Sequence, residues 1–207
     1  MALIAASDVK TFLRIAAGTT TWDTLIGVLV TNVVKFIETY LNRSLDETDY
    51  IELYSGEGGD RLMLDNYPLV SVSVLSQDID VDAKTYDDTM DTDDLILHEA
   101  GEIESLTEDF GEGKRNIYIE YTAGYGGSGA GAVSYPADLK MVAIEMAAKK
   151  FEDSGEKRFG ISSKNVMGEN IVFSFKDITD QHREILDRYR KPTQIKRGGT
   201  VSQYTAE

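Results

Sequence analysis

The segment from Asn116 to Asp153 constrains the fold most, because a strand pattern passes through a glycine-rich loop into a helix pattern. Apolar and polar side chains alternate over residues 116–123, as in a strand with one buried face. Pro136 suits the first turn of a helix, because its missing N–H has no helical partner there. The apolar residues that follow recur at helical spacing and predict one buried helix face: Leu139, Val142, Ala143, Met146 and Ala147.

Three other segments have helical patterns. The sequence predicts helices over residues 7–15, 21–43, 136–153 and 180–190. Ser7 and Asp180 are the expected N-caps of the first and the last helix, and Pro192 prevents the last helix from continuing. Many β-branched residues in the second helix lower its intrinsic stability, so we expect packing against other helices to stabilise it.

Between these helices, residues 50–122 contain short alternating runs separated by turn residues, which predict an inserted antiparallel sheet. A further hairpin is expected over residues 161–175, turning at residues 167–170. The predicted class is therefore α+β: a small helical bundle with an inserted antiparallel β-sheet and hairpins. We expect a single domain over residues 1–191 and an extended C-terminal tail over residues 192–207.

Composition limits the possible functions. The chain has 207 residues, of which 36 are acidic and 21 basic, giving a formal charge of -15. Such a chain should repel nucleic acid phosphates, so specific DNA binding is disfavoured. The absence of cysteine excludes disulfides and thiolate chemistry. The first six residues lack the pattern of a signal peptide, and the apolar run from Val28 to Val34 is much shorter than a membrane span. We expect neither a leader nor an anchor.

The order of several motifs resembles the head-tail connector proteins of tailed bacteriophages, also called adaptor or head-completion proteins. The resemblance covers most of residues 7–192 and rests on these segments in sequence: Asp8–Ile15, Phe36–Leu45, Tyr121–Gly126, Pro136–Lys140, Phe151–Glu152 and Ile185–Pro192.

This resemblance implies a structural virion protein that is not an enzyme and needs no cofactor. About a dozen copies would form a ring below the portal protein, since identical subunits close into rings through heterologous contacts. The ring would continue the DNA channel, let DNA pass without specific binding, and contact stopper or tail-completion proteins. Assembly would occur in the cytoplasm of the bacterial host, without a membrane. The alternative within the same machinery is a stopper or tail-completion protein.

The glycine-rich loop satisfies the G-x-G-x-x-G spacing of dinucleotide-binding loops from Gly124 to Gly129. In such loops the helix follows directly, whereas here Ala130 to Tyr135 intervene. A flexible or partner-contacting loop is therefore the preferred interpretation, with Gly126 and Gly127 as candidate contact residues. A dinucleotide-dependent enzyme is the competing interpretation.

An acidic segment has the first spacings of a helix-loop-helix calcium site. Ala83, however, stands where that loop needs glycine, and Thr89 where it needs glutamate. We therefore expect no metal site but a solvated acidic loop between strands, and an acidic calcium-binding interaction module stays the alternative of another class. In a ring these carboxylates would be candidates to line a DNA channel: Asp78, Asp80, Asp82, Asp87 and Asp88.

Catalytic patterns are weak. The two histidines, His98 and His182, are expected to be a strand-end residue and an exposed helix residue. No carboxylate pair stands out for acid-base catalysis.

The C-terminal tail has too few apolar residues for a core of its own. We expect it to become ordered by binding a partner, with residues 200–204 able to pair as an edge strand; a disordered terminus is the alternative. By the resemblance, the partner would be the portal, and the candidate portal-binding residues are Ile195, Lys196, Arg197, Val201 and Tyr204.

Overall fold

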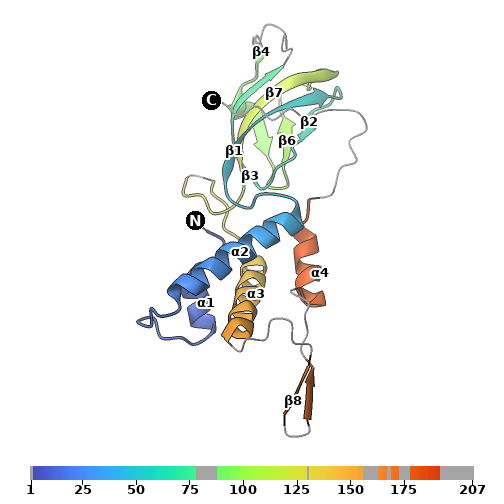
Figure 1. The fold of residues 1–207 in the computed structure, drawn as a ribbon. Coiled ribbons are helices and arrows are strands. Elements are labelled where there is room, and N and C mark those ends of the chain that lie inside the picture. Colours follow the sequence, from blue (N-terminus) through green and yellow to red (C-terminus); the bar gives the residue numbers. More distant parts are fainter. Residues whose placement is uncertain are drawn as a thin grey trace. The chain divides into compact units, whose positions relative to one another are not determined.

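The computed structural model describes residues 2–77, 88–129, 131–155, 163–166, 169–172 and 178–191. The chain divides into two units (Figure 1). We call residues 44–134 the β unit, and residues 2–43 together with 135–193 the helical unit. The chain therefore leaves the helical unit once, forms the β unit and returns. The predicted α+β class is confirmed, whereas the single domain expected over residues 1–191 stays a prediction.

The helical unit contains α1 (Ala6–Phe12), α2 (Asp23–Leu41), α3 (Ala137–Gly155) and α4 (Asp180–Tyr189). Helices α2 and α3 contact each other most extensively, and both α1 and α4 pack against this pair. The contacts bury the apolar face that periodicity predicts on α3, including Leu139, Val142 and Met146. All the predicted helices are present, with ends that differ by a few residues.

Several helix ends correct the sequence analysis. The N-cap of α1 is Ala5 rather than Ser7, and the Ala5 N–H donates to Asp8 Oδ2 at 2.8 Å. Helix α1 ends at Phe12, earlier than expected, because Arg14 turns into the left-handed region with φ of 58°. The last helix is capped by Thr179 rather than Asp180, since Thr179 Oγ1 accepts the His182 N–H.

Within the described residues, α2 is the one helix long and apolar enough to cross a membrane by length and composition alone. The core helix of a water-soluble protein passes the same test. Here α2 contacts α1, α3 and α4, and it buries Ile26, Val33, Ile37 and Leu41. One face of α2 therefore packs inside the helical unit, and 22% of its most apolar 18-residue stretch is buried.

The β unit contains two antiparallel sheets rather than the one small sheet that the sequence predicts. The first has the order β1-β7-β3-β4, with β1 (Thr48–Gly56), β3 (Leu69–Gln77), β4 (Asp88–Thr89) and β7 (Gly113–Ala123). The second has the order β2-β6-β5, with β2 (Arg61–Met63), β5 (Leu95–Leu97) and β6 (Glu102–Ser105), and a 3-10 turn, η1 (Thr92–Asp94), precedes β5.

One hydrophobic core joins the two sheets. Leu62 and Ile103 of the second sheet belong to the same buried cluster as Leu75, Ile117 and Ile119 of the first. Because side chains alternate along a strand, β7 supplies this core from one face.

The predicted hairpin over residues 161–175 corresponds to the antiparallel pair β8 (Ser163–Val166) and β9 (Glu169–Val172). Glu169 and Asn170 pair with Val166 and Asn165. They are therefore strand residues, not turn residues as the sequence analysis expected.

Candidate functional site

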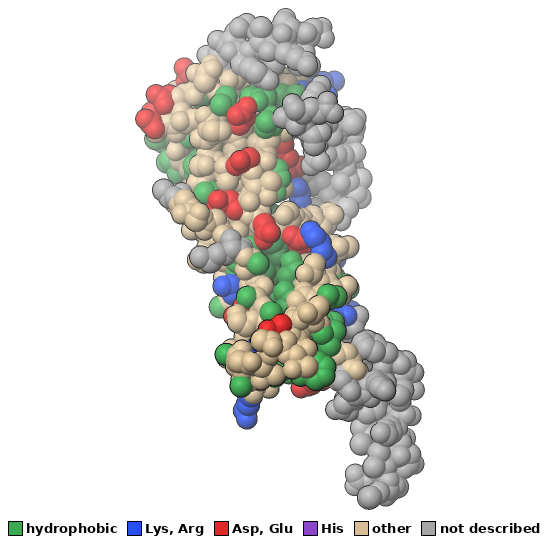
Figure 2. Space-filling view, turned by 60° about the vertical axis from the view of Figure 1, so that its left-hand side comes forward, with side chains coloured by type: hydrophobic (Ala, Val, Ile, Leu, Met, Phe, Trp, Pro, Cys, Tyr) green, Lys and Arg blue, Asp and Glu red, His purple; other side chains and the backbone are tan. Residues whose placement is uncertain are grey.

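Charge is divided unequally between the two units. Residues 44–134 contain 22 of the 36 acidic residues and 4 of the 21 basic residues, a formal charge of -18. The helical segments, residues 2–43 and 135–193, contain 15 basic and 13 acidic residues, a formal charge of +2. On the face shown in Figure 2, acidic side chains are spread over the β unit and hydrophobic ones gather on the helical unit. A surface on the β unit that contacts DNA or another copy would therefore be strongly negative, whereas such a surface on the helical unit would be nearly neutral.

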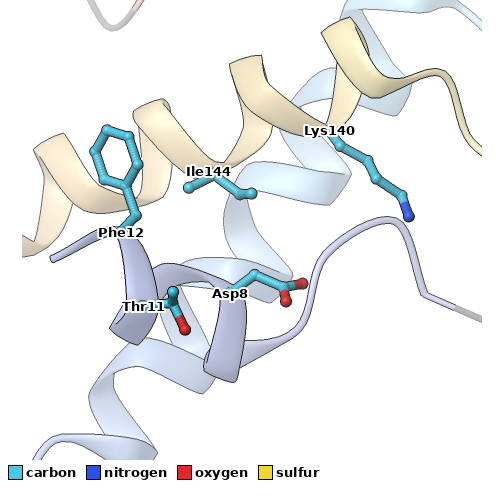
Figure 3. A pocket seen from close by; sticks show the side chains of 5 residues that line it. All are labelled: Asp8, Thr11, Phe12, Lys140 and Ile144. Carbon is cyan, nitrogen blue, oxygen red and sulfur yellow. The ribbon is translucent and has the colours of Figure 1, made fainter. Parts of the chain in front are cut away.

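A groove of about 400 Å³ lies between α1 and α3 in the helical unit (Figure 3). Phe12 and Ile144 lie toward one end of the groove, and the Asp8 carboxylate and Lys140 toward the other. Thr11 completes the lining. Asp8, Thr11 and Phe12 belong to α1, and Lys140 and Ile144 belong to α3. Spacings of three and four positions bring Asp8 together with Thr11 and Phe12, and Lys140 together with Ile144, on one face of each helix. The groove can accept an apolar side chain beside groups of both charges.

The helical unit exposes several large apolar side chains, one of which, Phe12, lines the groove. Phe12 is 46% exposed, and Met141, which follows Lys140 on α3, is also 46% exposed. Trp22, just before α2, is 45% exposed, and its ring meets the Phe151 ring edge-on at 5.8 Å between centroids. Single exposed apolar side chains are normal on folded proteins, and only a contiguous patch of them marks an interaction surface.

Lys10 fixes the loop that carries Trp22. Its ammonium group donates to the carbonyl oxygens of Ala17 and Thr19, at 3.2 and 2.7 Å, and to Asp23 Oδ1 at 2.8 Å. The side chain is largely buried, and the three acceptors offset the cost of removing its charge from water. The sequence analysis missed this residue, although Lys10 is the lone basic residue in a short, otherwise uncharged second half of α1.

The β unit contains a buried polar network around Glu52, which the sequence analysis also missed. Glu52 Oε2 accepts from the hydroxyls of Tyr121 and Tyr54 at 2.6 and 2.5 Å. Asn66 Nδ2 donates to Tyr121 Oη at 3.0 Å and to Glu52 Oε1 at 3.3 Å. Burial raises the pKa of Tyr121, and the hydrogen bond to Glu52 and its negative charge raise it further. Burial likewise raises the pKa of Tyr54, with smaller contributions from Tyr121 and Glu52. The network ties β1, β7 and the chain before β3 together.

The glycine-rich loop is anchored at its start to neighbouring backbone. Gly124 donates its N–H to Pro68 O at 2.9 Å, and Gly126 donates to Val133 O at 2.8 Å. Gly124 has φ of +123°, and a Cβ there would lie 2.5 Å from Asp46 O. A Cβ on Gly127 would collide with the Glu47 carboxylate. Glycine is thus required at position 124, where the neighbours are backbone atoms, whereas the flexible Glu47 side chain could shift away from a Cβ at position 127. The predicted partner contact of Gly126 and Gly127 stays a prediction.

Other sequence-predicted site residues lie partly or wholly outside the described residues. Asp88 is placed by its backbone in β4, paired with Gln77, and the described residues include no group of three metal-ligating side chains. The predicted roles of Asp88 and of the candidates outside the described residues stay predictions. Outside the described residues are the acidic candidates Asp78, Asp80, Asp82 and Asp87 and the tail candidates Ile195, Lys196, Arg197, Val201 and Tyr204.

The two histidines occupy different environments. His182 is 8% exposed, and its Nε2 lies 2.8 Å from Glu145 Oε2 on α3, so the expected exposed position is wrong. Leu186, one turn later, is also buried, and this i, i+4 relationship was the sequence signal that could have placed His182 on the buried face. His98 directly follows β5, as expected, and its Nε2 lies 3.4 Å from Glu104 Oε2.

Comparisons with known proteins agree on one family and one fold. Residues 2–192 match the family model described as Head completion protein. No curated protein sequence matches the chain significantly.

Three solved structures resemble the chain. One is from the neck of an empty gene transfer agent (GTA) particle with C6 symmetry, at 17% identity and a TM-score of 0.53, covering 91% of this chain and 90% of that chain. A second is from the virion of a native GTA particle, at 17% identity and a TM-score of 0.54, with the same coverage. A third is from the neck of a native GTA particle with C12 symmetry, at 15% identity and a TM-score of 0.50, covering 92% of each chain. At these identities the likeness shows the fold.

Proposed function

Because this chain belongs to the head completion protein family, we propose that it forms a ring below the portal that joins the phage head to the tail and continues the DNA channel. The observation that carries the proposal is the family match over residues 2–192, which includes both units. The fold shared with neck proteins of GTA particles supports a place in the virion neck, and the C12 symmetry of one such neck supports a ring.

The charge division supports a role beside DNA without specific DNA binding. The formal charge of -18 on residues 44–134 would repel phosphates. A channel wall of this charge lets the duplex pass without adhering. The ring would contact the portal on one side and stopper or tail-completion proteins on the other, after assembly in the host cytoplasm.

Deleting the gene for this chain in the source virus tests the proposal. We expect heads that contain portal but do not join tails, seen by electron microscopy, and recovery of joined particles when the chain is supplied from a plasmid. Normal yields of infectious, tailed particles after deletion would contradict the proposal. Binding of the purified chain to tail tubes but not to portal rings would instead favour a stopper or tail-completion protein.

A further inference from the structure

We propose that the C-terminal tail pairs as an added strand with the outer edge of β1 in its own chain. In this arrangement residues 200–204 run parallel to residues 48–52. The inference goes beyond the connector role and concerns the subunit before it binds the portal. The same tail contains the candidate portal-binding residues, so the portal would have to displace the tail from β1.

Strand β1 offers the longest edge in the β unit. It has nine residues, stands at the end of the order β1-β7-β3-β4, and pairs with β7 alone among the described residues. This pairing is regular from Thr48 to Tyr54. The other edge strands of the described β unit, β2, β4 and β5, have two or three residues each. A long edge with a regular backbone presents N–H and C=O groups that an added strand can bind.

The tail of the same chain can reach this edge. The Lys191 N–H donates to Leu41 O at 3.0 Å, and the tail follows Lys191 directly. Thr48 comes seven residues after Leu41, so the two lie at most about 25 Å apart. Thr200 comes nine residues after Lys191, and this linker spans up to about 32 Å when extended. Tethering raises the local concentration of the tail to roughly the millimolar range, an advantage that a strand from another copy lacks.

Residues 200–204 suit an added strand. Thr200, Val201 and Tyr204 are β-branched or aromatic residues, which favour strands. The segment contains no proline, so every residue can donate its N–H to a neighbouring strand.

Local charge supports the proposed register. Lys196 and Arg197 would lie beside the segment that leads into β1. That segment contains Asp46, which is exposed, and Glu47, which is half-buried. Such pairs contribute little energy in water, but opposite charges favour this register over others.

Hydrogen exchange of the purified full-length chain tests the pairing. The Val201→Pro/Ser202→Pro variant removes two adjacent N–H groups, one of which faces β1 in any register. The matched control is Thr205→Pro/Ala206→Pro, which lies outside the proposed strand. We expect the first variant to raise the exchange rate of the outward N–H groups of residues 48–52 at least about tenfold. The control should leave this rate unchanged, and residues 117–121 of the central strand β7 should exchange alike in both variants if the β unit stays folded.

Disulfide trapping identifies the occupant of the edge, because the chain has no cysteine of its own. Adjacent parallel strands bring paired Cα atoms within disulfide range. Thr48→Cys combined with Thr200→Cys should therefore form a disulfide within one chain, seen by mass spectrometry after proteolysis. The control combines Thr200→Cys with Leu97→Cys, at an exposed position on the edge strand β5, and should form far less disulfide.

Three results would overturn the inference. One is unchanged exchange of residues 48–52 in the Val201→Pro/Ser202→Pro variant, and another is an equal rise in its control. The third is a Thr48→Cys/Thr200→Cys disulfide that joins two chains, or that forms no more readily than the one to position 97. None of these results bears on the connector role, which depends on the presence of the chain in virus particles.

Discussion

The ammonium group of Lys10 lies 2.8 Å from Asp23 Oδ1 and thereby ties α1 to the first turn of α2. The Lys10 side chain is only 10% exposed, so its ammonium group meets little water. It also satisfies two carbonyl oxygens in the intervening loop. One side chain therefore determines the path of the chain between two helices.

Replacing Lys10 should destabilise the helical unit. We expect Lys10→Ala to lower the free energy of unfolding by about 2 kcal/mol, because two carbonyls and a carboxylate lose a charged donor. Urea unfolding measures the change. The matched control is Lys35→Ala, since Lys35 is 76% exposed and pairs with Glu38 on the surface of α2; its cost should be below about 0.5 kcal/mol. Equal effects of the two variants would refute this role of Lys10.

Removing one hydroxyl from the Glu52 network should destabilise the β unit. In Tyr121→Phe the buried Glu52 loses a donor and Asn66 loses an acceptor. We expect a loss of about 1–3 kcal/mol in the free energy of unfolding, as for other unsatisfied buried polar groups. Ser73→Ala serves as the control, because its exposed hydroxyl donates to Glu120 O on the same sheet and its loss should cost about 0.5 kcal/mol or less. A Tyr121→Phe variant as stable as the control would show that the network contributes little.

Stability should fall at alkaline pH. The pKa values of Tyr54 and Tyr121 are raised in the folded protein, so both hydroxyls keep their protons where the unfolded chain loses them. Above the ordinary tyrosine pKa of 10.0 the folded state binds more protons, and the free energy of unfolding decreases as pH rises.

The Tyr54→Phe/Tyr121→Phe double variant isolates this effect. Its stability should fall less steeply than that of the wild type above about pH 10, by up to about 1.4 kcal/mol per pH unit for each hydroxyl removed. Urea unfolding between about pH 8 and pH 11 gives both profiles. Parallel profiles throughout this range would mean that the two hydroxyls titrate alike in the folded and unfolded states.

The glycine-rich loop should tolerate a methyl group at one position and not at another. Gly124→Ala would strain a positive φ and bring Cβ within 2.5 Å of Asp46 O, so it should cost more than about 1 kcal/mol. Gly129→Ala meets nothing within 4 Å and should be nearly neutral. Thermal unfolding compares them, and a Gly124→Ala variant that melts with the wild type would contradict the tight packing of this loop.

The acidic candidates should affect the passage of DNA. Replacing Asp78, Asp80, Asp82, Asp87 and Asp88 by Asn would reduce the repulsion between a channel wall and phosphates. We expect slower DNA ejection in vitro, with the difference growing at low salt where screening is weak. Unchanged ejection kinetics would remove the channel-lining role of these residues. Replacing Glu184 and Asp187 on α4 in the same way provides a control with altered charge on the helical unit.

Periodicity in the sequence predicts the type and order of the elements, since both the 3.6-residue pattern of α3 and the alternation in β7 follow from one buried face. Periodicity does not show which strands pair with each other in a sheet. The pairing of Tyr50 with Tyr121 joins residues far apart in the chain, and no local pattern states it. For this reason the sequence indicates one sheet where the structure has two. Adjacent polar residues also compete as caps, as Thr179 and Asp180 do, and a local pattern does not decide between them.

Buried charges were the other source of error. Glu52 stands in an alternating strand where a carboxylate indicates a solvent-facing position, yet two tyrosines and Asn66 satisfy it inside the β unit. The Lys10 loop anchor depends likewise on acceptors seven to thirteen residues away. Such partners are brought together by the tertiary fold, so periodicity alone could not place them.

Counting copies of this chain in purified virus particles tests the connector role most directly. Quantitative mass spectrometry, with isotope-labelled peptides from this chain and from the portal protein, gives their ratio. A portal-bound ring predicts roughly one copy of this chain per portal subunit. Absence from particles, with the protein remaining soluble in the infected cell, would contradict the connector role.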